Sequence, residues 1–214
     1  MFFLGTQIQW DEHGRCTLLL DQTSSLKTAE LQASNNRILA RALTLTDDGT
    51  AACPISLSGA PDGGSTVRLA ANDSLRVGGS FWRISGLRIE SAGAGSGAAV
   101  ILSRPSGGRI EDVRVRQLEV HLRGDAQAHV LIERCSRCVV EGSTLTTEAG
   151  VSATSSVQAW TSSELLVLGN RFSAPIVLSA IETRSGTTDT TVVGNTFRGC
   201  SAANFDGAGA GVVV

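Results

Sequence analysis

The chain has 214 residues, of which 42% are apolar and 18% charged, and its formal net charge at pH 7 is −2. These proportions suit one packed domain and exclude extensive disorder. Because no broad excess of Lys and Arg is present to neutralise phosphates, nucleic acid is not an expected partner, and no run reaches the ~18 apolar residues of a membrane span.

Residues 1–37 precede the repetitive part of the chain and are expected to form a cap or docking segment. They lack the basic and apolar regions of a secretory signal, so no targeting segment is expected. Residues 7–10 and 16–20 flank a polar stretch with a glycine, which predicts a β-hairpin. Two serines before residues 26–31 predict a short helix over the first coil.

From residue 38 to residue 214 one short pattern recurs: apolar, any, Gly or Asp, small or apolar, any, apolar. The segments that match it are 84–89, 110–115, 140–145, 167–172 and 192–197. Their last residues lie 26, 30, 27 and 25 positions apart, a spacing typical of a solenoid. The runs are short, β-branched and broken by Gly, Ser and Thr, and further short runs lie between them. The sequence therefore predicts an all-β parallel solenoid of about seven coils.

Stacking of coils predicts one buried column made of the last residue of each segment. Its expected members are Ile89, Val115, Leu145, Phe172 and Phe197. Each coil would then cover the inward residues of the next coil. Gly or Asp at the third position of the pattern tolerates a left-handed backbone. Asn170 and Asn195 fall on equivalent positions of successive coils and are predicted to stack as an amide ladder.

This pattern resembles the right-handed parallel β-helix proteins of the pectate-lyase-like superfamily over about residues 38–200. Residues 49–57 (GTAACPISL) and 73–87 (DSLRVGGSFWRISGL) are similar to coil-forming segments of the chondroitinase B and alginate lyase family. The resemblance implies a right-handed parallel β-helix. It also implies that polysaccharide lyases and hydrolases share the fold.

The resemblance further implies a lyase site whose key groups this chain lacks. In that family a catalytic lysine stands on the strand before the segment that matches residues 192–197, and this chain has Arg184 there. An arginine stays protonated in proteins and is therefore a poor general base. The family's calcium-binding carboxylates fall where this chain has residues 176–179, IVLS. Neither a metal nor another cofactor is therefore expected.

An enzymatic alternative stays open, namely a lyase or epimerase that acts on an acidic polysaccharide. Its candidate residues are expected on the outer faces of adjacent coils: Glu133, Arg134, Arg137, Glu182 and Arg184. Any solenoid with solvated faces brings carboxylates such as Glu133 and Glu182 onto neighbouring coils, so this pairing has little specificity. Arg104, Pro105 and Arg109 depart in spacing from the Arg/Pro-rich segment of pectate lyases and are predicted to form a surface turn.

Cysteine and tryptophan supply the remaining candidates. Cys135 and Cys138 form a lone CxxC and are predicted to be buried structural thiols, because no second pair of ligands gives a zinc spacing. The cysteines are odd in number and scattered, which favours mostly reduced thiols. Trp82 and Trp160 are predicted at the surface, where they could stack on sugar rings or anchor a neighbouring subunit.

We therefore expect a non-catalytic structural or adhesive protein. The expected setting is a bacteriophage virion, as capsid decoration, tail or fibre, or an extracellular surface. Expected partners are further copies of the chain or other virion subunits, with polysaccharide as an alternative through a glycan-binding module that uses Trp82 and Trp160. Residues 212–214 predict an apolar edge strand that another chain covers, unless the chain is a fragment of a longer β-helix.

Overall fold

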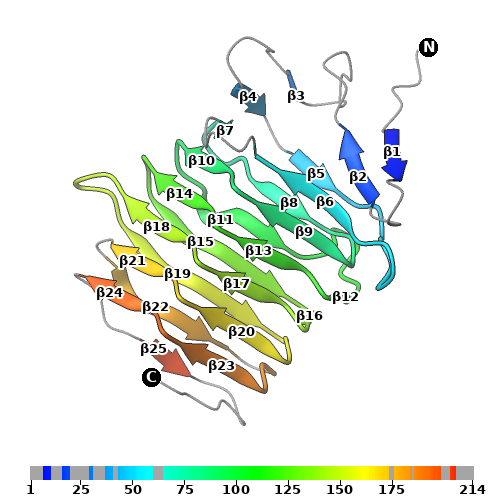
Figure 1. The fold of residues 1–214 in the computed structure, drawn as a ribbon. Helices are drawn as coiled ribbons and strands as arrows, with labels where there is room; N and C mark the ends of the chain where they lie inside the picture. The colour runs from blue at the N-terminus through cyan, green and yellow to red at the C-terminus, as the bar shows by residue number, and fades with distance from the viewer. Residues whose placement is uncertain are drawn as a thin grey trace.

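The protein is described by a computed structural model in which short β-strands stack into an elongated solenoid (Figure 1). Residues 43–59, 65–173, 179–184 and 186–198 are described with their side chains. A further set of strands is described by backbone alone: residues 7–10, 16–19, 29–30, 37–40, 176–178 and 203–205. Within these ranges no helix is present, and none therefore has the length and apolarity to cross a membrane.

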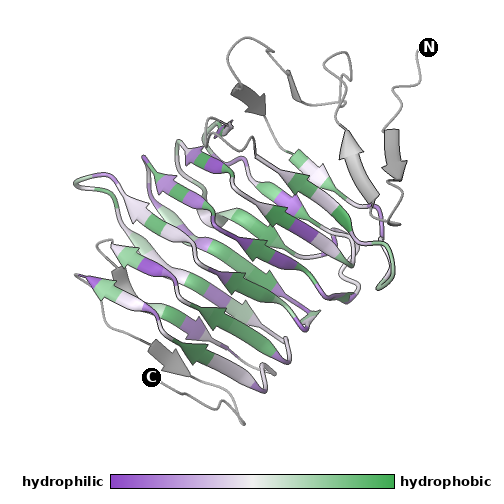
Figure 2. Cartoon of the chain, viewed as in Figure 1, coloured by the Kyte–Doolittle hydropathy of each residue, from purple (hydrophilic) through white to green (hydrophobic). Residues whose placement is uncertain are grey.

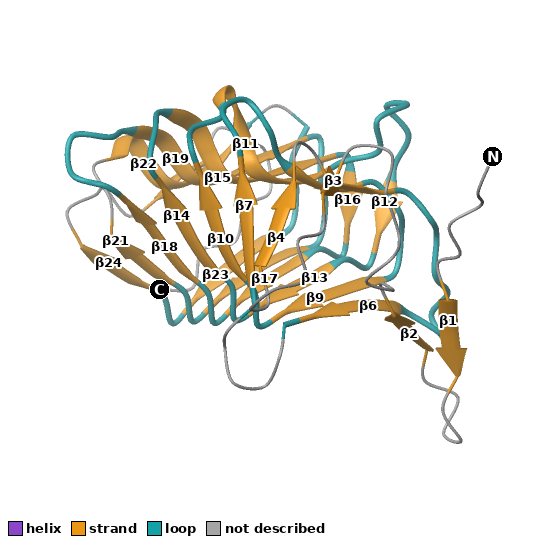
Figure 3. Cartoon of the chain, turned by 90° about the horizontal axis from the view of Figure 1, so that it is seen from above, coloured by secondary structure: helices purple, strands orange, loops and turns teal. Residues whose placement is uncertain are grey.

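Three sheets, parallel throughout except where β3 meets β4, enclose the interior, as the view from above shows (Figure 3). The eight-stranded sheet contains β3 (Ala29–Glu30), β4 (Arg37–Ala40), β7 (Thr66–Leu69), β10 (Arg88–Ser91), β14 (Glu119–Leu122), β18 (Thr144–Thr147), β21 (Arg171–Ser173) and β24 (Thr196–Arg198). The seven-stranded sheet contains β5 (Leu43–Leu45), β8 (Leu75–Val77), β11 (Gly95–Leu102), β15 (Ala126–Glu133), β19 (Ala153–Trp160), β22 (Ile176–Thr183) and β25 (Ala203–Phe205). The six-stranded sheet contains β6 (Ile55–Ser58), β9 (Trp82–Ser85), β13 (Arg114–Arg116), β17 (Val139–Glu141), β20 (Leu165–Leu168) and β23 (Thr190–Val193).

Each coil passes once through the eight-stranded, the seven-stranded and the six-stranded sheet. About five coils run from β7 to β23, while β4 to β6 precede them and β24 and β25 follow. The additional pair β12 (Ile110–Glu111) and β16 (Cys135–Ser136) lies in the connection to the six-stranded sheet. The prediction of an all-β parallel solenoid is confirmed, whereas the count of about seven coils was too high.

The core consists of columns of apolar side chains that lie in register from coil to coil. Apolar and polar residues alternate along the strands, as the bands of Figure 2 show. One column of the eight-stranded sheet runs through Val67, Ile89, Val120, Leu145, Phe172 and Phe197. Val115 was wrongly predicted in this column, because it pairs with Ile84 and Val140 in the six-stranded sheet.

The misplacement of Val115 has a specific cause in the turns. The turn from the six-stranded to the eight-stranded sheet has a left-handed residue in every coil: Gly86, Gln117, Gly142, Gly169 and Gly194. The turn before the six-stranded sheet is also left-handed, and it uses Phe81, Asp112, Arg137, Glu164 and Asp189. The segment that contains Asp112 therefore matched the pattern although Asp112 belongs to the other turn. The position that corresponds to the glycines of the other coils is Gln117, a residue type that the pattern does not include.

The predicted amide ladder is present at the glycine turns. Asn170 Nδ2 donates to Asn195 Oδ1 at 3.0 Å and to the carbonyl of Val140 at 2.9 Å. Asn170 Oδ1 accepts from the backbone N–H of Ser143 at 2.9 Å, so the ladder extends one coil further. These bonds satisfy backbone groups that the turns leave without a strand partner.

The N-terminal segment agrees in part with the sequence. β1 (Gln7–Trp10) pairs antiparallel with β2 (Cys16–Leu19), so the predicted hairpin pairing is confirmed. The helix predicted over residues 26–31 is wrong at Ala29–Glu30, which form β3 and pair antiparallel with β4. The edge strand predicted at residues 212–214 lies outside the described residues.

One titratable side chain lies in the interior. His129 on β15 is fully buried, and its Nε2 lies 2.9 Å from the carbonyl of Thr146. Burial lowers the pKa of His129 to about 4, and hydrogen bonds to the backbone of Thr146 and Ser155 only partly oppose this. His129 is therefore neutral in the folded protein at pH 7.

Replacement of Gln117 by glycine should stabilise the protein. Gln117 is exposed and has a φ of 51°, so Gln117→Gly relieves a left-handed backbone, and we expect the free energy of unfolding to rise by about 0.5–1 kcal/mol. The control is Gly142→Ala, where an added Cβ meets nothing closer than Gln117 Cγ at 3.8 Å. This variant should lose about 1 kcal/mol. Urea denaturation measures both, and a loss in Gln117→Gly would contradict the argument.

Stability should fall as the pH is lowered from 6.5 towards 4. The pKa of His129 is about 4 in the folded protein and 6.5 in the unfolded chain, so the unfolded state binds more protons in this window. The free energy of unfolding should drop by on the order of 3 kcal/mol across it. His129→Gln should flatten the dependence measured by urea denaturation. An unchanged slope in that variant would show that other groups are responsible.

Candidate functional site

A cleft of about 400 Å³ opens at the ends of three strands of the seven-stranded sheet, β11, β15 and β19. It is lined by residues that end these strands or follow them, together with Arg76 of β8: Arg76, Ser103, Arg104, Pro105, Gly107, Glu133, Arg134, Trp160 and Thr161. Glu133 and Trp160 are in register on neighbouring strands. The parallel stack thus brings residues about one coil apart in the sequence to one place.

Cations dominate the lining of the cleft. Arg76, Arg104 and Arg134 contribute three positive charges, and Glu133 is the only carboxylate in the lining. Arg104 Nη2 contacts Asp48 Oδ1 at 2.6 Å. A backbone hydrogen bond from Ser80 and the neighbouring Arg104 lower the pKa of Asp48 despite its partial burial.

The other two arginines of the lining make weaker or neutral contacts. Arg76 Nη1 donates to Ser103 Oγ at 3.4 Å, and Arg134 Nη1 donates to the carbonyl of Gly107. Neither of these contacts involves a carboxylate, and among the described residues neither Arg76 nor Arg134 forms an ion pair. The cleft is therefore suited to an anionic group.

Trp160 forms the aromatic wall of the cleft. It is half-buried and packs on a small apolar cluster of the outer sheet face: Ala98, Ile101, Ala128 and Leu131. Arg184 Cζ lies 5.6 Å from the centroid of the Trp160 ring. The apolar cluster and the guanidinium group over the ring hold Trp160 in one orientation.

Two turns that border the cleft have an unfavourable backbone. Arg134 has a φ of 51° and Thr161 a φ of 50°, and both follow strands of the seven-stranded sheet directly. Positive φ is uncommon for residues other than glycine and is an outlier for a β-branched threonine. The same conformation recurs at Asp112, Arg137 and Glu164 in the turns before the six-stranded sheet, so it is a feature of the solenoid turns and does not by itself single out the cleft.

Glu182 and Arg184, two candidates of the enzymatic alternative, lie next to the cleft but not in its lining. Glu182 is buried and accepts hydrogen bonds from Ser155 Oγ and Gln158 Nε2 at 2.6 Å, and from Arg184 Nε at 2.8 Å. Burial alone raises the pKa of Glu182, but these hydrogen bonds and the charge of Arg184 outweigh it and lower the pKa below its usual value. Glu182 is therefore an ionised, fully engaged acceptor.

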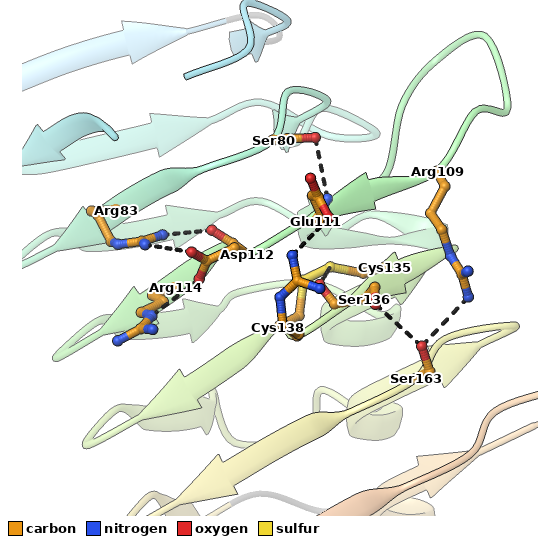
Figure 4. A network of polar contacts seen from close by, with 11 residues as sticks. Ser80, Arg83, Arg109, Glu111, Asp112, Arg114, Cys135, Ser136, Cys138 and Ser163 are labelled. Atoms are coloured by element: carbon orange, nitrogen blue, oxygen red, sulfur yellow. Dashed lines mark hydrogen bonds and ion pairs between the residues drawn. A yellow bond between two sulfur atoms is a disulfide. The ribbon is translucent and has the colours of Figure 1, made fainter. Parts of the chain in front are cut away.

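Arg137 lies elsewhere, in the turn before the six-stranded sheet, and its Nη2 contacts Glu111 Oε2 at 2.7 Å. Figure 4 shows this surface, where Asp112 binds both Arg83 and Arg114. Burial raises the pKa of Asp112, but its two arginines outweigh this and lower it. The five sequence candidates are thus divided: Glu133 and Arg134 line the cleft, Glu182 and Arg184 adjoin it, and Arg137 is separate.

Two predictions about side-chain state were wrong. Trp82 was expected at the surface, but it is 1% exposed and its Nε1–H donates to the carbonyl of Asp47 at 2.7 Å. Cys135 and Cys138 are buried as predicted, yet they form a disulfide across a Cα–Cα distance of 6.1 Å rather than free thiols (Figure 4). Cys53 is also disulfide-bonded.

Among the described residues no group of three or more His, Cys, Asp or Glu side chains could hold a metal ion. Lys27, the one lysine of the sequence, lies outside the described residues.

Comparison with family models, curated proteins and solved structures gives no match for this chain. The described residues form a parallel solenoid, and the resemblance to the pectate-lyase-like superfamily stays an expectation from the sequence motifs. Sequence reasoning identified Trp160, Glu133 and Arg134, which line the cleft, but missed Arg76. The only signal for Arg76 in the sequence was its position on β8, next to β11, a strand with apolar outward residues.

Proposed function

We propose that the protein is a non-catalytic adhesive solenoid that binds an acidic saccharide in the Arg/Trp cleft. The observation that carries this proposal is the composition of the lining, in which three arginines and a half-buried tryptophan surround a single carboxylate. Guanidinium groups pair with the carboxylates or sulfates of acidic sugars. The face of Trp160 suits the apolar face of a sugar ring.

The state of the carboxylates supports binding rather than turnover. Glycoside hydrolysis requires two carboxyl groups about 5–9.5 Å apart on either side of the bond, whereas the lining supplies Glu133 alone. A lyase requires a base that can accept a proton. Glu182 is ionised but buried, and three donors already occupy it.

The virion or extracellular setting and the assembly into homo-oligomers remain predictions from the sequence. A stack of coils held by parallel ladders and a continuous core suits a protein exposed to proteases. The mass of the protein in solution tests the oligomer independently of any ligand.

Titration with acidic oligosaccharides tests the proposed function. Oligomers of alginate, pectate and chondroitin would be compared with neutral oligosaccharides by isothermal titration calorimetry. At least one acidic oligomer should bind saturably, and Arg134→Gln and Trp160→Ala should each weaken it about tenfold, which corresponds to about 1.4 kcal/mol. Arg116→Gln is the control, because Arg116 is an exposed arginine paired with Glu141 outside the cleft.

Two outcomes contradict the proposal. Equal weakening by Arg116→Gln and Arg134→Gln would show unspecific attraction to positive charge. Release of unsaturated product from any acidic polymer, abolished by Arg184→Ala, would favour the lyase or epimerase alternative instead.

A further inference from the structure

A second group of arginines lies on a different surface, the outer face of the eight-stranded sheet. Glu90 on β10 has a side chain that is 9% exposed, and three arginines converge on it. Arg68 Nε contacts Glu90 Oε2 at 3.2 Å, Arg88 Nε contacts Oε1 at 3.1 Å, and Arg123 Nη2 contacts Oε2 at 3.2 Å. Arg68 and Arg88 come from strands β7 and β10, and Arg123 follows β14, so three successive coils build the group. We call Arg68, Arg88 and Arg123 the arginine triad.

The triad has more positive charge than Glu90 can balance. Three guanidinium groups share one carboxylate, which leaves a local charge of +2. Elsewhere among the described residues one carboxylate binds at most two arginines, as Asp112 does with Arg83 and Arg114. Three like charges held together repel one another, so an anion bound between them would stabilise the arrangement.

Neighbouring acidic groups do not neutralise the remaining positive charge of the arginine triad. Glu119 lies opposite Arg88 on β14, but it is exposed and makes no ion pair within the described ranges. Asp125 accepts hydrogen bonds from Ser152, and His121, opposite Glu90, contacts Thr146 Oγ1 through Nδ1. The excess positive charge at the triad therefore faces solvent.

The geometry also leaves donors available. Arg68 and Arg88 contact Glu90 through Nε, and Arg123 through Nη2, so other guanidinium nitrogens remain for a ligand. The three side chains are 40%, 47% and 51% exposed, so a ligand can reach them from solvent. Each guanidinium fork matches the spacing of two oxygens of a sulfate or phosphate group.

We propose that the arginine triad binds a tetrahedral oxyanion, the sulfate or phosphate monoester of a larger ligand, with Glu90 as the buried residue that holds the three arginines together. A dianion matches the local charge, and a tetrahedral group presents oxygens in three directions, one for each arginine. The site is separate from the Arg/Trp cleft and does not depend on the function proposed for it.

Isothermal titration with inorganic sulfate and inorganic phosphate, at constant ionic strength set by NaCl, tests the site. Saturable binding is expected, and Arg68→Gln and Arg123→Gln should each weaken it about tenfold. Each variant leaves Glu90 with two arginines, and an unchanged circular dichroism spectrum verifies the fold. Arg171→Gln is the matched control, because Arg171 is exposed on the same sheet face without an ion pair among the described residues, and it should change affinity less than twofold.

The outcomes separate this site from the cleft. Because the cleft also suits an anion, the titrations are repeated in an Arg134→Gln background. Binding that persists in this background and is weakened by Arg68→Gln places the ion at the triad. Binding that Arg134→Gln abolishes and Arg68→Gln leaves intact places the ion in the cleft, and the triad proposal is then wrong. Equal weakening by Arg171→Gln, or no saturable heat, would overturn it as well. Once inorganic ions bind, a sugar sulfate and a sugar phosphate distinguish the two sources of the oxyanion.

Discussion

In-register stacking of coils is the constraint on which the whole structure depends. A single coil cannot bury its inward side chains, so each coil is stable only when its neighbours cover it. Phe172 and Phe197 illustrate this, since their rings stack with centroids 5.2 Å apart and an interplanar angle of 18°. Because the backbone ladders fix the inward columns, they also fix the outward ones, and side chains some 25 residues apart become neighbours on the surface.

The outward columns explain why the two arginine groups differ. On the seven-stranded sheet the column from Ile101 through Leu131 changes to Gln158 and Glu182, so an apolar floor that supports Trp160 meets a buried polar network. That combination gives a cleft with an aromatic wall. On the eight-stranded sheet the strands are short, and the arginines meet above a single carboxylate without a wall. The first arrangement suits a ring with a charge, whereas the second suits a compact ion.

The sequence predicted most of the fold because the fold is periodic. Four of the five matches to one pattern were correct, which outweighs any single ambiguous strand, and the amide ladder followed from the spacing of Asn170 and Asn195. The errors had two different causes. Asp112 and Gln117 both have a left-handed backbone, so the residue types in the pattern did not show which of the two stands at the glycine turn. Trp82, in contrast, shares its side of β9 with Ile84, so the alternation of the strand already places it inside. The cleft was less predictable, since Arg76 and Arg104 reach it only through the stack.

The backbone at the cleft follows from the way the solenoid turns. Left-handed residues other than glycine cost roughly 1–2 kcal/mol each. The turns after β15 and β19 accept this cost at Arg134 and Thr161, and the turn before the six-stranded sheet accepts it at Asp112, Arg137 and Glu164, outside the lining of the cleft. The left-handed conformation therefore belongs to the coil, whereas the side chain at each of these turns is not fixed by the backbone alone. At Arg134 the side chain adds a guanidinium group to the lining of the cleft.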